Sequence, residues 1–229
     1  MFIAEGYHLV EAAIKSGWQL ERVICEPAMV DQTTKLGMAK AMIRTVPAAQ
    51  FGKIAQSDSP QGILAIASIR DYGKSASEII RKAKRLVACD SINDPGNLGT
   101  IIRTAVGFNY DAIILIGNCA EVYNPKTVRA TQGAIFAIPV LNFSGPEPFL
   151  KALSGKFDLI ALSNTAAKPL ASINRIKRPA VILGGEITGI DSQILAKANY
   201  RLRIEQSDRI ESLNVSVAAG IAMYKFAAD

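Results

Sequence analysis

Short apolar runs that alternate with helical segments are the feature that most constrains how this chain folds. From residue 85 onward, runs such as 86–90 and 112–116 have the length and composition of buried strands, and segments with helical spacing of apolar residues separate them. Strands that alternate with helices form a mostly parallel sheet covered on both faces. The sequence therefore predicts an α/β fold for this region.

The expected elements divide the chain into two α/β units joined by a linker. In residues 85–229 we expect strand 86–90, helix 97–107, strand 112–116, helix 125–132, strand 135–141, helix 146–154, strands 158–162 and 180–184, helix 191–196, strand 200–204 and helix 212–227. In residues 1–70 we expect helices 5–17, 31–42 and 47–55 and strands 21–25, 45–46 and 62–68. Residues 71–84 are more polar and are interpreted as a linker with a short helix. The predicted domains are therefore 1–70 and 85–229.

The charge balance is basic but modest. The 229 residues carry a formal net charge of +6, and the pI is about 9.3. Basic side chains cluster at residues 81–85 and 175–178. Such clusters bind nucleic-acid phosphates or form ordinary solvated faces, and the charge pattern alone leaves both interpretations open.

The cysteine and histidine content argues against a metal centre and a disulfide framework. Cys25, Cys89 and Cys119 lie far apart, and His8 is the only histidine. We therefore expect no metal and a reducing, cytoplasmic setting. No apolar run is long enough to span a bilayer, and the N-terminus lacks the pattern of a signal peptide, so no membrane partner is expected.

Three polar loops follow apolar runs in the second half of the chain. The first carries Asn97 and Arg103, the second carries Glu186, and the third carries Ser212 and Asn214 at the expected start of the last helix. Asn97 is also interpreted as a helix cap, and Glu186 as a solvated or capping carboxylate. Ligands of open α/β sheets bind beyond the carboxyl ends of the strands, which favours one composite site over three unrelated turns.

The sequences of these loops resemble three family motifs. Residues 97–105 resemble N-x-G-x-x-x-R-T-A, residues 183–189 resemble an apolar strand that enters G-x-E-x-x-G, and residues 212–218 read S-L-N-V-S-V-A. Together, in this order, they resemble the SpoU (TrmH-like) branch of the SPOUT RNA methyltransferases. Residues 1–70 are similar to the small RNA-binding domain of that family, which itself resembles a large-subunit ribosomal protein.

The resemblance implies a fold, a reaction and partners. It implies a deep trefoil knot in residues 85–229, a homodimer formed through that domain, and transfer of a methyl group from S-adenosylmethionine to a ribose 2′-hydroxyl. It also implies a structured RNA substrate, with ribosomal RNA favoured and tRNA as the alternative. The implied catalytic set is Asn97, Arg103, Glu186, Ser212 and Asn214. The implied cofactor-binding set is Leu162, Ser163, Leu183, Gly184, Gly185, Ile204 and Leu213.

The chain departs from the family pattern in two places. Glu205 stands where the family usually has proline, which puts the shape of the following loop in doubt. The chain also starts at the Glu5-Gly6 segment, without the helix that normally precedes it, so we expect either a small domain that is short at its N-terminus or one whose start differs from that of the family.

The role of Arg103 and two rival functions remain open at this level. A guanidinium is almost always protonated, which favours Arg103 as an anchor for the target phosphate over Arg103 as the base. A nucleotide-dependent Rossmann enzyme is one alternative, although no complete G-x-G-x-x-G is present. A non-catalytic RNA-binding protein with the same fold is the other.

Overall fold

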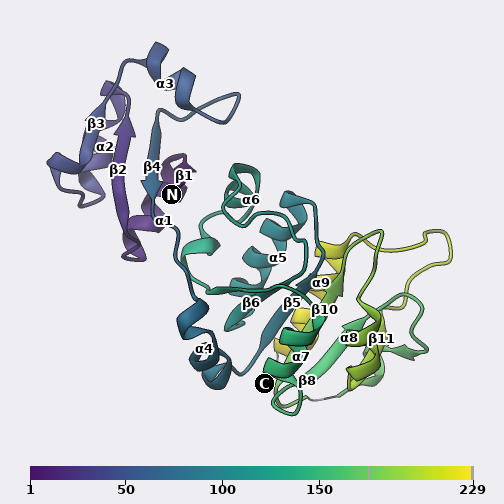
Figure 1. Ribbon diagram of the computed structural model, residues 1–229. Coiled ribbons are helices and arrows are strands. Elements are labelled where there is room, and N and C mark those ends of the chain that lie inside the picture. The colour runs from purple at the N-terminus through teal and green to yellow at the C-terminus, as the bar shows by residue number, and fades with distance from the viewer. Residues whose placement is uncertain (175, 228–229) are drawn as a thin grey trace.

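The computed structural model describes residues 1–174 and 176–227, and these residues form two β-sheets (Figure 1). The first sheet has four strands in the order β1 (Phe2–Glu5), β4 (Ile63–Ala67), β2 (Leu20–Cys25) and β3 (Ile43–Thr45). The second has seven strands in the order β7 (Val140–Phe143), β6 (Ala112–Ile116), β5 (Leu86–Asp90), β10 (Pro179–Gly184), β8 (Asp158–Leu162), β11 (Tyr200–Arg203) and β9 (Lys168–Pro169). Every pairing in the second sheet is parallel, as the alternating pattern predicted.

Helices cover both faces of the second sheet. One face packs against α5 (Pro95–Gly107), α6 (Pro125–Ala130) and α9 (Val215–Ala227), and the other against α4 (Ala76–Lys82), α7 (Pro146–Leu153) and α8 (Ser192–Lys197). Side chains alternate between the faces, so that Val87 and Cys89 join the first core, and Leu86 and Ala88 the second. This double burial explains why the strands are almost continuously apolar. Among the described residues, no helix is long and apolar enough to cross a membrane.

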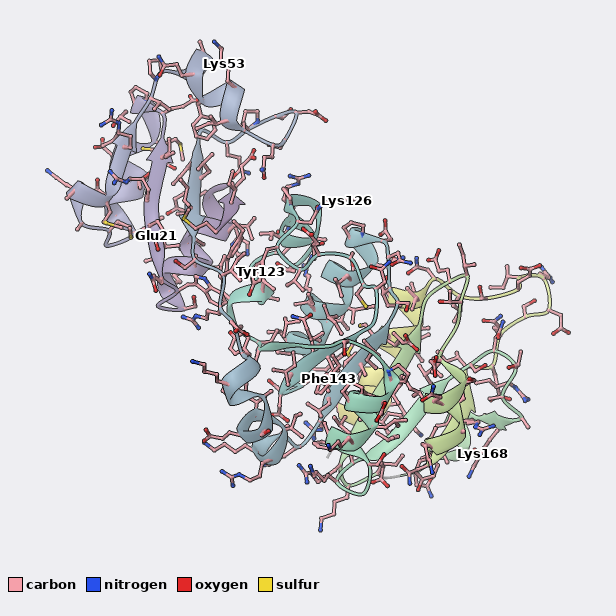
Figure 2. The ribbon with its side chains drawn as sticks, in the orientation of Figure 1. Glu21, Lys53, Tyr123, Lys126, Phe143 and Lys168 are labelled. Atoms are coloured by element: carbon pink, nitrogen blue, oxygen red, sulfur yellow. The ribbon has the colours of Figure 1, made fainter. Side chains whose placement is uncertain are left out.

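The four-stranded sheet carries α1 (Tyr7–Lys15), α2 (Val30–Lys35) and α3 (Ala48–Ile54), and it is joined to the larger unit by an aromatic cluster. Phe2 stacks on Tyr123 and Phe136 with ring centroids 4.6 and 6.1 Å apart, and Trp18 meets Phe136 edge-on at 5.3 Å. Tyr123 lies where the two units approach each other (Figure 2). The apolar cores of the two units are therefore continuous.

Three expectations about the elements are wrong or incomplete. Residues 134–136 form a 3₁₀ turn, and the strand expected at 135–141 is β7, which begins at Val140. The helix expected at 31–42 ends at Lys35, because Gly37 has a positive φ of 84° that breaks it. Strands β1 and β9 were not anticipated.

The segment expected to be a linker contributes to the larger unit. Within residues 71–84, Ile80 of α4 and Ala83, which directly follows the helix, are buried in the core on the second face of the sheet. The side chain of Arg178 donates to the carbonyl oxygens of Ile80 and Ala83 at 3.2 and 2.7 Å and stacks over Phe157. These contacts attach α4 firmly to the larger unit.

Candidate active site

The three polar loops converge at the carboxyl edge of the second sheet. Strands β5 and β10 are neighbours, and Gly184 at the end of β10 pairs with Asp90 at the end of β5. After β5 the chain continues to β6 and β7 on one side of this pair, and after β10 it continues to β11 on the other side. Such a switch in strand order is where open α/β sheets bind their ligands.

A chain of side-chain hydrogen bonds connects the loops. The amide nitrogen of Asn97 donates to Oε1 of Glu186 at 3.0 Å, and the amide nitrogen of Asn214 donates to Oδ1 of Asn97 at 3.0 Å. One residue from each loop therefore takes part. The two contacts fix which end of the Asn97 amide faces each neighbour, since an amide presents a donor and an acceptor on opposite sides.

Asn97 is not the helix cap that the sequence indicated. Helix α5 begins at Pro95, and its N-cap is Asp94, whose carboxylate accepts from the backbone N–H of Asn97 at 2.8 Å. Lys126 donates to the same carboxylate at 3.1 Å. Because Asp94 satisfies the helix end, the side chain of Asn97 is available to Glu186 and Asn214.

The start of the last helix also differs from the expectation. Helix α9 begins at Val215, so Ser212, Leu213 and Asn214 precede it instead of forming its first turn. Oδ1 of Asn214 accepts from the backbone N–H of Ser216 at 2.9 Å, the contact typical of an N-cap. Asn214 thus caps α9 with its oxygen and reaches Asn97 with its nitrogen.

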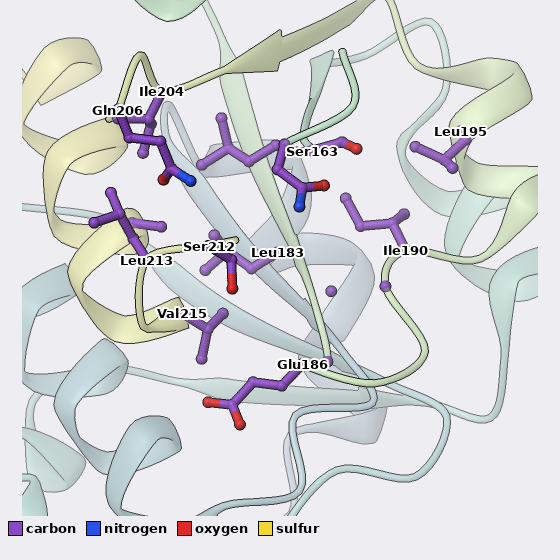
Figure 3. A pocket seen from close by; sticks show the side chains of 16 residues that line it. Ser163, Leu183, Glu186, Ile190, Leu195, Ile204, Gln206, Ser212, Leu213 and Val215 are labelled. Atoms are coloured by element: carbon purple, nitrogen blue, oxygen red, sulfur yellow. The ribbon is translucent and has the colours of Figure 1, made fainter. Parts of the chain in front are cut away.

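A cavity of about 210 Å³ lies beside this network (Figure 3). Its lining includes all seven residues of the expected cofactor-binding set and two of the expected catalytic set: Leu162, Ser163, Leu183, Gly184, Gly185, Ile204, Leu213, Glu186 and Ser212. The sequence missed the other lining residues, Asn164, Gly189, Ile190, Leu195, Gln206, Val215 and Ala218. Most of these lie within three residues of a predicted position. The loops that follow the strands could therefore have been predicted as whole segments to line the cavity.

Two glycines allow the backbone to pack closely at the floor of the cavity. A Cβ on Gly184 would lie 2.2 Å from the carbonyl carbon of Gly189, and one on Gly185 would lie 2.4 Å from the backbone oxygen of Ser91. Both neighbours are main-chain atoms that cannot move aside. Gly184 and Gly185 are therefore required by the packing of the loop that follows β10.

Arg103 lies apart from the network. It is exposed on α5, and within the described part of the chain it makes no hydrogen bond or ion pair. Thr104, one residue further, packs toward Gly220 of α9. The structure thus leaves the guanidinium of Arg103 accessible to a substrate, and it does not bring it to Asn97.

The described residues of the two basic clusters that adjoin β5 and β10 lie at the opposite edge of the sheet. Lys84 and Arg85 immediately precede β5, and Lys177 and Arg178 immediately precede β10. Five strand residues at about 3.3 Å each separate this edge from the site by about 16 Å. The guanidinium of Arg178 is engaged with α4, and Arg175 lies outside the described residues. Among the described residues of the two clusters, Lys84, Arg85, Lys177 and Arg178 are therefore too far away to contact a group bound in the cavity.

Glu205 leaves the Ile204 position intact. Ile204 lines the cavity, and Glu205 beside it is exposed. The following loop is closed by Gln206, whose amide nitrogen donates to the backbone oxygen of Glu211 at 3.1 Å. Ile204 therefore still lines the cavity although Glu205 replaces the usual proline.

Fold and cavity define an α/β protein that binds a nucleotide-like cofactor at the carboxyl edge of a parallel sheet. Residues 84–224 match the model of the SpoU rRNA Methylase family, and residues 1–65 match that of the MRM3-like substrate binding domain. The chain belongs to the SpoU rRNA methylase family, as the three motifs indicated. It is accordingly an S-adenosylmethionine-dependent RNA methyltransferase, and the Rossmann alternative is wrong.

Individual relatives cover nearly the whole chain. The 23S rRNA (guanosine(2553)-2'-O)-methyltransferase RlmP of Bacillus subtilis is 34% identical over 97% of this chain and 87% of its own length. The AdoMet-bound rRNA methyltransferase of Sinorhizobium meliloti is 29% identical, with a TM-score of 0.86 over 98% of this chain and 85% of its own. AviRb of Streptomyces viridochromogenes, solved with the cofactor AdoMet, shares the fold at 19% identity, with a TM-score of 0.85 over 98% of this chain and 88% of its own.

Proposed function

We propose that the protein methylates a ribose 2′-hydroxyl in ribosomal RNA of the large subunit. The observation that carries the proposal is the hydrogen-bonded chain from Asn214 through Asn97 to Glu186 at the rim of the cavity. The relative in Bacillus subtilis named for 2'-O-methylation of 23S rRNA supports the choice of RNA.

The cavity suits S-adenosylmethionine in its chemistry. Apolar side chains of Leu162, Leu183, Ile204 and Leu213 offer surfaces for an adenine ring. Gly184 and Gly185 expose backbone, and Ser163, Asn164 and Gln206 supply polar groups at the other walls. Leu162, Ser163, Leu183, Gly184, Gly185, Ile204 and Leu213 would hold the cofactor, which supplies an activated methyl group on a sulfonium sulfur.

The protein's contribution to the reaction is mainly positioning. Transfer forms a bond from the ribose oxygen to the methyl carbon and breaks the bond from that carbon to sulfur, and the hydroxyl proton passes to solvent. Glu186 holds the amide of Asn97, and Asn97 and Asn214 order the rim where the ribose must lie. Ser212 lines the cavity beside them. Alignment of the reacting atoms accounts for most of the acceleration expected here.

Arg103 serves as an anchor for the RNA phosphate next to the target ribose. Its guanidinium is exposed, and it has no partner among the described residues that would compete with a phosphate. A permanently protonated guanidinium binds phosphate through two parallel hydrogen bonds and stabilises negative charge on the reacting oxygen. Arg103 therefore acts as a cation in this proposal, and not as the base.

Residues 1–70 serve as the RNA-binding domain of the proposed enzyme. The match of residues 1–65 to a substrate-binding domain supports this role, as do exposed basic side chains at Arg22, Lys35, Lys40 and Lys53. The similarity of this small α/β unit to a large-subunit ribosomal protein stays a prediction. A cytoplasmic location, where ribosomal RNA is made accessible to modification, belongs to the same proposal.

We also propose a knotted homodimer. After β11 near the edge of the sheet, the chain returns to the middle, where α9 packs on α5 and β10, and this return supports the trefoil knot. Helix α9 leaves Val217, Ile221 and Tyr224 exposed at 51, 40 and 69%, on one face at helical spacing. A second copy of the chain would cover this apolar face.

The proposal is tested by incubating the purified protein with methyl-labelled S-adenosylmethionine and ribosomal RNA that lacks modifications. We expect label in large-subunit RNA, at one nucleotide that then resists alkaline cleavage because its 2′-oxygen is methylated. Labelling of tRNA alone would contradict the choice of substrate. Cofactor binding without transfer to any cellular RNA would support a non-catalytic RNA-binding protein instead.

A further inference from the structure

One buried carboxylate that takes no part in the proposed chemistry lies directly behind the cavity. Asp90 is the last residue of β5 and is 5% exposed. It does not line the cavity, but two residues that do are in contact with it: Gly184 pairs with Asp90 in the sheet, and Gly185 donates to its main-chain oxygen. Burial of a carboxylate is costly unless hydrogen bonds compensate, and burial raises the pKa of Asp90 above its usual value. A buried acid of this kind needs a structural or functional reason.

Both ends of the loop between β10 and α8 are attached to Asp90. At the start of the loop, the backbone N–H of Gly185 donates to the main-chain oxygen of Asp90 at 2.9 Å. At its end, the backbone N–H of Asp191 donates to Oδ2 of Asp90 at 2.7 Å. The hydroxyl of Ser91 donates to Oδ1 at 3.1 Å and holds the carboxylate in this orientation.

The loop held in this way forms one wall of the site. Glu186, which accepts from Asn97, is its second residue, and Gly185, Gly189 and Ile190 line the cavity. Within the loop, the backbone N–H of Gly189 donates to the backbone oxygen of Gly185 at 2.9 Å and closes a turn. Removing the carboxylate of Asp90 would free one end of this wall and leave the other attached.

The same contact fixes the start of α8. Asp191 caps that helix through its own carboxylate, which accepts from the backbone N–H of Gln193 at 2.8 Å. Leu195 of α8 lines the cavity opposite Leu213, and Ile190 lies between Leu195 and Glu186 (Figure 3). Displacement of Asp191 would therefore move Leu195 as well as the loop.

We propose that Asp90 is a positioning residue of the cofactor pocket, whose carboxylate oxygen holds residues 185–191 and the start of α8 in the shape that binds S-adenosylmethionine. This inference rests on the proposed function. It assigns Asp90 no contact with the cofactor or the RNA. What Asp90 supplies is a hydrogen-bond acceptor at the position of Oδ2, and an amide oxygen at the same place can serve as well.

The test compares D90A, D90N and D111A in the full-length protein. Asp111 is a matched control, because its Oδ2 accepts from the backbone N–H groups of Lys84 and Arg85 at 2.7 and 2.9 Å, at the edge of the sheet away from the cavity. The dissociation constant of S-adenosylmethionine is measured by titration calorimetry, and the unfolding temperature by circular dichroism. KM for the cofactor and kcat are measured with the RNA that the wild type methylates.

We expect D90A to weaken cofactor binding about tenfold, which is the loss expected for one buried charged hydrogen bond. KM for the cofactor should rise in step, with a smaller fall in kcat. D90N should bind within about threefold of the wild type, because its side-chain oxygen can still accept from Asp191. D111A should lower the unfolding temperature and leave cofactor affinity unchanged. If D90A does not fold, D90S replaces it, since a serine hydroxyl is too short to reach Asp191.

Wild-type affinity in D90A or D90S, or an equal loss in D111A, would overturn the assignment of Asp90 and leave the proposed function standing. A D90N protein as weak as D90A would also overturn it, because the hydrogen-bond acceptor would then not be what matters. A wild-type protein that fails to bind S-adenosylmethionine would overturn the proposed function, and this inference with it.

Discussion

At the scale of single residues, the network of Asn97, Glu186 and Asn214 lies at the surface, so it should matter more for activity than for stability. Glu186 and Asn214 are exposed, and hydrogen bonds that water can replace contribute little to folding. We expect N97A to unfold within about 0.5 kcal/mol of the wild type. Methyl transfer should fall about 100-fold, because the rim that orients the ribose loses its central member. Unfolding in urea and single-turnover methylation measure the two effects.

Thr100 provides the matched control for this prediction. It is exposed one turn further along α5, and its hydroxyl donates to the backbone oxygen of Gly96 at 2.8 Å. T100A should leave both methylation and stability close to wild type. If N97A were as active as T100A, the network would have no role in catalysis.

The assignment of a cap shows what sequence can and cannot decide for a single residue. The motif placed Asn97 at a helix start, and the polar type of the side chain fits a cap. The structure gives that role to Asp94, because Pro95 occupies the first helical position and Asp94 precedes it. Contact between Asn97 and Glu186, 89 residues apart in the chain, depends on which strands become neighbours, and local patterns do not specify that.

At the scale of elements, continuous apolar runs were the reliable signal. Strands 86–90, 112–116 and 158–162 agree with the structure to the residue, since a run of apolar residues bounded by polar ones has clear ends. The strand predicted at 135–141 begins only at Val140. Positive φ angles at Gln132 and Gly133 turn the chain, so the first residues of the apolar run do not pair with a neighbouring strand. The order of the strands could not be predicted, because β5 pairs with β10, and the strands β6 to β9 lie between these two in the sequence.

The loop after β10 has the strictest backbone requirement in the site, and a single methyl group tests it. In G184A the new Cβ would lie 2.2 Å from the carbonyl carbon of Gly189, so the loop must shift. We expect G184A to lose measurable binding of S-adenosylmethionine in calorimetry and to unfold at a lower temperature. G107A is its control, because nothing lies within 4 Å of a Cβ at Gly107 in α5. That variant should be more stable by about 0.5 kcal/mol and bind the cofactor normally. Unchanged affinity in G184A would mean that the loop tolerates displacement.

At the scale of the whole molecule, packed aromatic side chains join the two units. The rings of Phe2, Trp18, Tyr123 and Phe136 bury the contact between them, and Arg70 lies 3.9 Å above the ring of Trp18. Arg178 attaches α4 at the far end of the connection. The larger unit presents its cavity at the carboxyl edge of its sheet, away from the basic clusters. If residues 1–70 bind the RNA as proposed, the RNA is held by a unit that is firmly attached to the one that carries the cavity.

The exposed face of α9 makes the assembly of the molecule testable. Val217, Ile221 and Tyr224 form an apolar stripe on a helix whose other side is core, and a soluble monomer rarely leaves such a stripe uncovered. We expect the wild type to sediment as a dimer and the double variant I221D/Y224D as a monomer, because two copies of the stripe would then bring four carboxylates together. I69D is the control, since Ile69 is also exposed, at 50%, but lies outside α9. It should remain dimeric. A wild-type protein that sediments as a monomer at every concentration would contradict the homodimer, and the stripe on α9 would then have to meet another partner.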